Sequence, residues 1–314
     1  MIASLALVCV AAAILVLGPR LAAASWVQQA PRVAIFAWQA MTVSALVAVV
    51  LAGVTLLIPI TALANDLGAI IRACAVSVAS SYGSSQFLPG KLVGAVLAGA
   101  IPLWVGITGA RVLLGSWRTR RSLRRSLSLV TETDARLGVS VLDSPAPAAF
   151  CVPGRRARIV VTRGALDQLS RDELSGVLEH EAAHLRGRHN LAVALSQILA
   201  RAFPRVPLFQ VATQETRQLI ELLADDAALR QVNRVDLASA IVSLAEMRAP
   251  AAAMAMARDA AVLRVSRLLT PLPPLEPWRH RAAALGAMAV VMAPLLIAGY
   301  PALCAALSDL CSIP

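Results

Sequence analysis

Four long apolar runs constrain this 314-residue chain more than any other feature. They cover residues of about 1–18, 33–60, 91–115 and 282–307. A membrane-crossing helix needs roughly 20 mainly apolar residues, and a run inside lipid must satisfy its own backbone hydrogen bonds, so it folds as a helix. The overall composition, 58% hydrophobic residues with a mean hydropathy of +0.70, agrees. The sequence therefore predicts a mainly α-helical, multi-pass membrane protein with four transmembrane helices.

The first run has a competing interpretation as a cleaved signal peptide, because Leu21–Ala24 resembles a cleavage site. It has no positively charged segment before its apolar part, which a signal peptide normally carries. We therefore expect a retained membrane helix. Residues 61–89, which are Ser-rich and mixed in polarity, are expected to form a loop between the second and third runs.

Arginine placement predicts the topology. Residues 116–281, between the third and fourth runs, contain 24 arginines against 16 acidic residues, and many of the arginines flank the apolar runs. The positive-inside rule then places this insertion in the cytoplasm and both termini outside. The arginines do not form one stripe with aromatic residues, so we expect the lipid bilayer and no direct nucleic acid as a partner. The basic segment 116–129 is expected to be a helix that contacts anionic headgroups.

The insertion has the pattern of an α+β domain. Three short β-like runs, separated by prolines and a glycine, predict a small sheet: residues 139–142, 148–152 and 158–162. Ser170 and Glu173 form a capping-box pattern and predict a helix from Arg171 to about Arg186. Two more helices are expected over residues 190–203 and 211–230. The predicted domains are residues 1–115 with three membrane helices, the cytosolic domain 116–281, and residues 282–314 with the fourth helix and a short outer tail.

The predicted helix 171–186 carries the sequence His-Glu-x-x-His, formed by His180, Glu181 and His184. Positions i and i+4 lie on one helix face, so both imidazoles can bind one metal ion. Glu181 can then act as general base on a water at the metal. This pattern predicts a catalytic zinc site, which takes three protein ligands and one water.

Six residues are candidates for the missing ligand or for a supporting role: His189, His280, Glu215, Glu221, Asp225 and Asp226. His189 lies about 140° around the helix from His184, so we expect it to be exposed at the helix end. His280 is expected at the membrane interface. Glu221 stands among leucines, where burying a carboxylate is costly unless it meets a cation. We therefore expect Glu221 to be the third ligand, with Asp225 accepting the spare N–H of a ligand histidine.

The five cysteines form no Cys-x-x-Cys pair, so no cysteine zinc site is indicated. Cys151 is expected to be a buried apolar residue of the cytosolic domain. Cys74, Cys304 and Cys311 would lie on or near the outer face, where the sequence does not decide whether a disulfide forms.

The segments H180-E-A-A-H184 and E221-L-L-A-D225 resemble those of the membrane gluzincins, which include the BlaR/MecR-type antibiotic-sensing receptors and the HtpX/Ste-type proteases. The resemblance covers about Leu142 to Ala228. It implies a gluzincin-like zinc peptidase in which His180, His184 and Glu221 bind Zn²⁺, Glu181 activates water and Asp225 supports a ligand histidine. The arrangement of three runs, an insertion and a fourth run is similar to the BlaR/MecR type. Only Ser308–Pro314 follow the fourth run, so the receptors' outer sensor domain has no counterpart and β-lactam sensing is not expected.

The expected function is a zinc-dependent endopeptidase that cleaves a protein on the cytosolic side of the membrane. Its substrate would be a transcriptional repressor encoded nearby in the receptor-type branch, or damaged membrane proteins in the HtpX-like quality-control branch. The alternative from another class is a non-proteolytic signal transducer in which zinc is structural.

Overall fold

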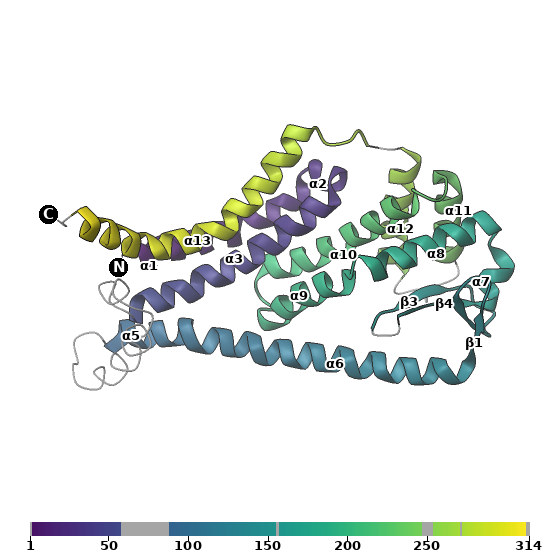
Figure 1. The fold of residues 1–314 in the computed structure, drawn as a ribbon, viewed down its shortest axis with the longest axis horizontal. Coiled ribbons are helices and arrows are strands. Elements are labelled where there is room, and N and C mark those ends of the chain that lie inside the picture. Colours follow the sequence, from purple (N-terminus) through teal and green to yellow (C-terminus); the bar gives the residue numbers. More distant parts are fainter. Residues whose placement is uncertain (1, 58–87, 155–156, 247–253, 271, 312–314) are drawn as a thin grey trace.

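The chain folds mainly into helices, with one small sheet (Figure 1). The computed structural model describes residues 2–57, 88–154, 157–246, 254–270 and 272–311. The long apolar elements are α1 (Ile2–Leu17), α3 (Pro31–Leu57), α5 (Leu88–Ala95), the π-helical turn η4 (Val96–Ala100), α6 (Ile101–Val130) and α13 (Pro277–Cys311). The short elements η1 (Gly18–Ala23) and α2 (Trp26–Gln29) connect α1 to α3. The start of α1 and the end of α13 lie at the same end of the molecule (Figure 1).

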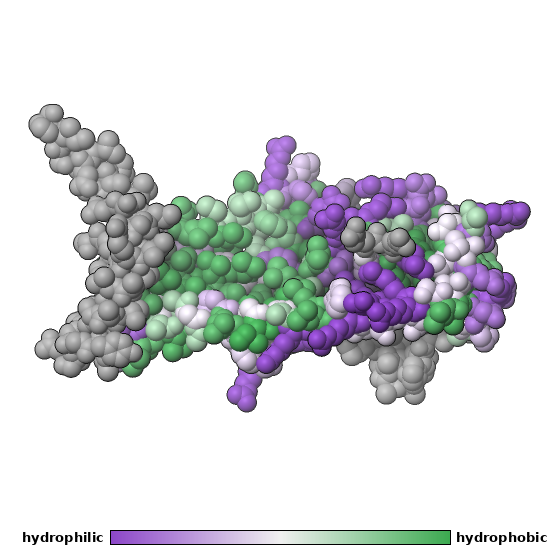
Figure 2. All heavy atoms as spheres, turned by 60° about the horizontal axis from the view of Figure 1, so that its bottom comes forward, coloured by the Kyte–Doolittle hydropathy of each residue, from purple (hydrophilic) through white to green (hydrophobic). Residues whose placement is uncertain are grey.

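Within the part of the chain that the structure describes, four helical segments are long and apolar enough to cross a membrane: Ile2–Ala23, Pro31–Leu57, Pro89–Val130 and Pro277–Tyr300. Figure 2 shows hydrophobic atoms gathered over one half of the molecule and hydrophilic atoms over the other. The prediction that the four apolar runs are helical is confirmed for the described residues. The sidedness of the chain stays a prediction, and most of the predicted loop 61–89 lies outside the described residues.

The third apolar run continues without a break into the basic segment. Pro102 directly follows the π-helical turn η4, a local adjustment that accommodates the missing N–H, so the helical path continues from α5 through η4 into α6. The helix then extends to Val130 and carries the arginines of residues 118–125 on its last turns. The span and the basic helix, which the sequence suggests as separate elements, are thus one long element.

The sheet has four strands in the order β1-β2-β4-β3. The strands are β1 (Thr131–Asp134), β2 (Val139–Leu142), β3 (Ala149–Val152) and β4 (Arg158–Thr162). β2 pairs parallel to β4, and the outer pairs are antiparallel. The three predicted strands are confirmed. The sequence Thr-Glu-Thr-Asp of β1 has no apolar alternation, so its pattern does not mark it as a strand.

In the described residues, six helices lie between the sheet and α13: α7 (Arg163–Gln168), α8 (Arg171–Arg186), α9 (His189–Ala202), α10 (Pro207–Ala228), α11 (Arg234–Glu246) and α12 (Met254–Leu269). The capping box that begins α8 is confirmed. The Ser170 hydroxyl accepts from the Glu173 backbone N–H at 3.3 Å, and the Glu173 carboxylate accepts from the Ser170 N–H at 2.8 Å. These bonds satisfy two of the unpaired donors at the helix start, so the boundary is fixed locally.

One hydrophobic core joins the inserted segment to the apolar helices. Trp38 of α3, Leu208 and Leu222 of α10, and Leu199 of α9 are all at most 2% exposed and belong to one cluster. The Trp104 indole N–H of α6 also donates to the Ala202 carbonyl of α9 at 2.9 Å. The α9–α10 hairpin is therefore packed against α3 and α6, and it links the site described below to the apolar helices.

Candidate metal centre

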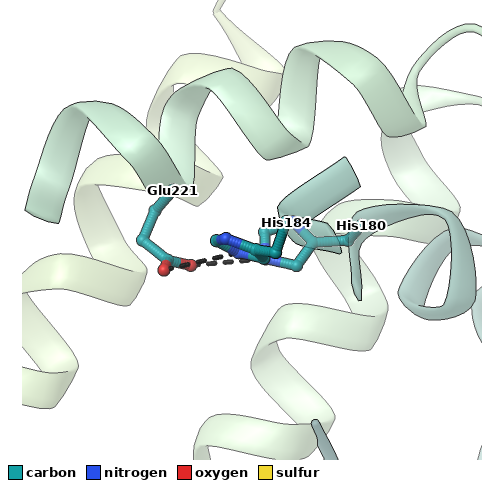
Figure 3. A group of neighbouring side chains, drawn as sticks. All are labelled: His180, His184 and Glu221. Atoms are coloured by element: carbon teal, nitrogen blue, oxygen red, sulfur yellow. Dashed lines mark hydrogen bonds and ion pairs between the residues drawn. The ribbon is translucent and has the colours of Figure 1, made fainter. Parts of the chain in front are cut away.

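Helix α8 places His180 and His184 on one face, one turn apart. Their Nε2 atoms lie 3.1 Å from each other, and both rings point in the same direction (Figure 3). His180 is buried, with 7% of its surface exposed, and His184 is half-buried. Two imidazole nitrogens held this close leave one position that a shared cation can fill.

Glu221 enters the same position from α10 (Figure 3). Its Oε2 atom lies 3.3 Å from His180 Nε2, and its Oε1 atom lies 3.6 Å from His184 Nε2. In the described part of the chain these three residues form a cluster whose ligand atoms all lie within 4.8 Å of one another. The neighbouring residues Ile220 and Leu222 are buried, at 3% and 1% exposure. Their burial fixes the rotation of α10 about its axis, and this rotation directs Glu221 towards the two histidines.

The geometry of the cluster fits a zinc ion. Two ligand atoms about 2.1 Å from a shared tetrahedral centre are roughly 3.4 Å apart. The 3.1 Å between the two imidazole nitrogens, and the 3.3 and 3.6 Å from these nitrogens to the two different oxygens of Glu221, lie close to this value. A set of two imidazoles and one carboxylate is also a usual ligand set of catalytic zinc, with one position left for water. Burial alone would raise the pKa of Glu221, but His180 and Arg264 lower it to about 2, so the ligand carboxylate is ionised.

Asp225, one turn after Glu221, lies against the other ring nitrogen of His180. Its Oδ1 atom is 2.9 Å from His180 Nδ1, and the aspartate is fully buried. A carboxylate at Nδ1 favours the tautomer with its proton there, which leaves Nε2 free to bind a metal. Burial acts to lower the pKa of His180, but the hydrogen bonds to Asp225 and Glu221 raise it to about 9.

Arg264 of α12 also contacts these side chains, although no sequence pattern predicted a role for it. Its guanidinium donates to both carboxylate oxygens of Asp225, at 2.6 and 2.8 Å, and lies 3.3 Å from Glu221 Oε2. Arg264 therefore balances the charge of two buried carboxylates. It is 39 residues from Asp225, so no helical spacing relates the two positions. The feature of the sequence that could have indicated a role for Arg264 is its position as a single arginine after the apolar residues Ala260, Ala261 and Leu263.

The prediction that His189 is an exposed helix-end residue is wrong. His189 is 9% exposed, and its Nδ1 atom lies 3.1 Å from His184 Nδ1. The 140° offset assumed one continuous helix, but Arg188, with φ of 47°, ends the helical path and redirects the chain. Burial, with a smaller contribution from His184, lowers the pKa of His189 to about 4, so its ring is neutral and can accept the His184 Nδ1–H.

Glu181 faces a cavity of about 490 Å³ that the metal cluster also lines. Burial raises the pKa of Glu181 from its ordinary value, which is the direction that favours a general base. Cys151 of β3 lies beside it. The expectation of a buried apolar cysteine is wrong, because Cys151 is half-buried and lines the cavity. Burial and the Glu181 carboxylate raise the pKa of the Cys151 thiol to about 12.

The three other candidate ligands lie elsewhere. His280 is exposed near the start of α13, and Glu215 is half-buried on α10 outside the metal cluster. Asp226 pairs with Arg267 of α12, at 2.7 and 3.0 Å. The structure thus brings together His180, His184, Glu221 and Asp225.

The chain is similar to known peptidases over this part of its length. Residues 121–270 match the family model of Peptidase family M48. A protease HtpX homolog of Salinibacter ruber is 38% identical over 74 residues, which are 23% of this chain and 26% of the relative. A protease HtpX homolog of Pyrococcus abyssi is 40% identical over 67 residues, which are 20% of this chain and 23% of the relative.

These matches span about a quarter of the length of the curated relatives. No solved structure gives a significant match. The matched residues 121–270 contain the whole metal cluster together with Asp225 and Arg264. Taken with the apolar helices, the similarity of residues 121–270 to Peptidase family M48 supports a membrane-associated metallopeptidase.

Proposed function

We propose that this protein is a zinc-dependent endopeptidase of the bacterial cytoplasmic membrane. His180, His184 and Glu221 are the proposed zinc ligands, and Glu181 is the proposed general base. The observation that carries the proposal is the close approach of the three ligand atoms, within 4.8 Å, at a cavity that Glu181 also lines. A structural zinc site needs neither an open position nor a carboxylate beside it.

The chemistry follows from the placement of these residues. A zinc ion at this position would polarise the scissile carbonyl and acidify water. The Glu181 carboxylate takes a proton from the attacking water and delivers it to the leaving amine nitrogen. Asp225 holds the proton of His180 on Nδ1, and Arg264 holds Asp225, so the orientation of the first ligand is fixed before the substrate arrives.

The sheet offers a way to hold an extended substrate. β3 is the terminal strand of the sheet, and its residues Ala149, Phe150 and Cys151 line the cavity at the metal cluster. An extended peptide that binds alongside a terminal strand gains main-chain hydrogen bonds largely independent of its sequence. We infer that β3 aligns the scissile bond with Glu181.

We infer that residues 116–281 form the peptidase unit between the third and fourth spans, and that this unit lies in the cytosol with both termini outside. The excess of arginine over acidic residues supports this orientation. The relatives are named as HtpX homologs, which favours the HtpX-like branch of the expected function, whereas the order of three spans, peptidase unit and fourth span favours cleavage of a repressor. In both possible functions the substrate is a protein on the cytosolic side of the membrane.

The decisive test compares Glu181→Gln with the wild-type protein, both purified in detergent and loaded with zinc. Hydrolysis of a quenched fluorescent peptide library should fall by about three orders of magnitude or more, because the base is lost while the ligands remain. Glu179→Gln is the matched control on the same helix, since Glu179 pairs with Arg186 on the surface and is not part of the cluster. Undiminished hydrolysis by Glu181→Gln would contradict the mechanism.

The signal-transducer alternative makes a different prediction. If zinc only braces the fold, His180→Ala should abolish function while Glu181→Gln preserves it. A chelator should in that case reduce the thermal stability of the protein without suppressing any peptide hydrolysis.

A further inference from the structure

The metal cluster lies where two cavities meet. The first has a volume of about 490 Å³ and the second about 750 Å³. Cys151, His184 and Glu221 line both of them. A peptide whose scissile bond lies at the cluster would therefore extend into a different cavity on each side of that bond.

The first cavity is apolar away from the cluster. Its wall is built by α11 and α12, which contribute Leu237, Ile241, Leu244, Ala260 and Ala261. Among the described residues of this wall, Arg264 is the one basic side chain, and its charge is balanced by Asp225 and Glu221. This cavity favours an uncharged, apolar side chain, because a charged one would be desolvated there without a free partner.

The second cavity is basic. It runs between α6, α9 and α10, and it is lined by Arg120, Arg201 and Arg217. Among the described residues that line it, the one carboxylate is the proposed ligand Glu221. Nowhere in the described ranges does a carboxylate lie within 4.0 Å of the guanidinium of Arg120, Arg201 or Arg217.

Three arginines without an acidic neighbour in one cavity create a positive potential that attracts carboxylates. Arginine also presents a planar set of donors that matches a carboxylate. Figure 2, which turns α6 towards the viewer, shows hydrophilic atoms gathered over the half of the molecule that carries the sheet. The residues Cys151, Val152 and Pro153 of the β3 end also line this cavity, so a peptide aligned with β3 passes into it.

We propose that the site selects substrate segments with an apolar side chain on one side of the scissile bond and an acidic side chain on the other. Arg120, Arg201 and Arg217 are the specificity-determining residues for the acidic side chain. This inference rests on the proposed endopeptidase function, and it adds the class of sequence that the enzyme cleaves.

The test uses the full-length protein in zwitterionic detergent with a peptide series. One aspartate is moved through the four positions on either side of the scissile bond of an otherwise apolar and neutral peptide, and Asn and Lys replace it in matched peptides. We expect kcat/KM to be about tenfold higher for Asp than for Asn on one side only, and the difference to shrink as salt rises. Equal values for Asp, Asn and Lys at every position would overturn the inference.

Charge reversal gives a readout that a misfolded variant cannot produce. Arg201→Glu and Arg217→Glu should each move the preference from the Asp peptide towards the Lys peptide. Arg205→Glu is the matched control, because it makes the same charge change on the α9–α10 turn and lines neither cavity. A preference in Arg201→Glu and Arg217→Glu that equals the wild-type preference would contradict the assignment.

A measurement of peptide binding tests the inferred selectivity independently of the proposed hydrolytic function. Fluorescence anisotropy with the Glu181→Gln protein measures the affinity for the same peptides without hydrolysis. If the wild type cleaves no peptide but the Asp peptide binds about tenfold more tightly than the Asn peptide, the selectivity stands and the hydrolytic function fails. If Asp and Asn peptides bind equally, the inference fails whether or not cleavage occurs.

A phospholipid headgroup is the competing occupant of the basic cavity. In nanodiscs that contain phosphatidylglycerol, Arg201→Glu and Arg217→Glu should retain as much of this lipid as Arg205→Glu if the cavity binds peptides. A loss of bound phosphatidylglycerol together with an unchanged peptide preference would assign the cavity to headgroups and overturn the inference.

Discussion

His180 Nδ1 lies 2.9 Å from Asp225 Oδ1, although the two residues belong to different helices and are 45 positions apart. The aspartate is fully buried, and Arg264 contacts both of its oxygens. This contact sets which nitrogen of His180 faces Glu221 and His184. Asp225 therefore orients the His180 ring through Nδ1, on the side of the ring opposite to the Nε2 atom that faces His184 and Glu221.

Asp225→Asn should weaken zinc binding by roughly ten- to a hundredfold, because an amide holds the proton of His180 less firmly than a carboxylate. Zinc content measured by mass spectrometry after equilibration with a zinc buffer series checks this. Asp226→Asn is the matched control, since Asp226 pairs with Arg267 on the same two helices and does not contact the cluster. Equal affinities of the two variants would contradict the role of Asp225.

Arg264→Gln should lower both zinc affinity and stability. The variant removes the guanidinium that pairs with buried Asp225 and leaves His180 as the remaining partner of this carboxylate; breaking a buried pair costs about 3–5 kcal/mol. The thermal unfolding midpoint in detergent should fall clearly below that of Arg267→Gln, whose ion pair with the half-buried Asp226 contributes less. Similar midpoints for the two variants would show that Arg264 does not support the site.

His189→Leu should weaken zinc binding, by roughly tenfold or more, because the Nδ1–H of His184 then has no acceptor. His189→Asn, which retains an acceptor oxygen, should recover part of the affinity. His280→Leu serves as the control because His280 is exposed on α13. If the His189→Leu protein bound zinc as tightly as the wild-type protein, the contact between His189 and His184 would have no role in zinc binding.

Glu173→Ala should destabilise the protein by about 1 kcal/mol at pH 7, because the start of α8 loses its reciprocal cap. The hydrogen bonds from Ser239 and Ser170 lower the pKa of Glu173 below its ordinary value of 4.5 in the folded protein. A depressed folded-state pKa stabilises the fold above the unfolded value, and the contribution is lost as pH falls through the folded value. The difference from wild type should thus be constant from pH 6 to 7 and shrink below about pH 4.5.

Thermal unfolding followed by near-ultraviolet circular dichroism across this pH range measures the effect of Glu173→Ala. Asp172→Ala, in the same first turn, provides the comparison, because the Asp172 side chain makes none of the described hydrogen bonds. A difference between Glu173→Ala and wild type that grew at acidic pH would contradict the assigned cap.

The sequence alone determined the local elements. The apolar runs fix the long helices because backbone groups in a lipid-facing segment must bond within the segment. Ser170 and Glu173 fix the start of α8, and the i, i+4 spacing fixes His180 and His184 on one face. These features depend on residues at most a few positions apart, so they can be read directly from the chain.

Only the tertiary structure decided what surrounds that helix face. A left-handed residue at Arg188 turns His189 back onto His184, which the helical spacing did not predict. The contact of Arg264 with Asp225 depends on how α12 packs against α10. The apolar and basic cavities likewise depend on how α6, α9 and α11 approach the cluster. Such contacts join distant positions through the packing of whole helices, so no local pattern encodes them.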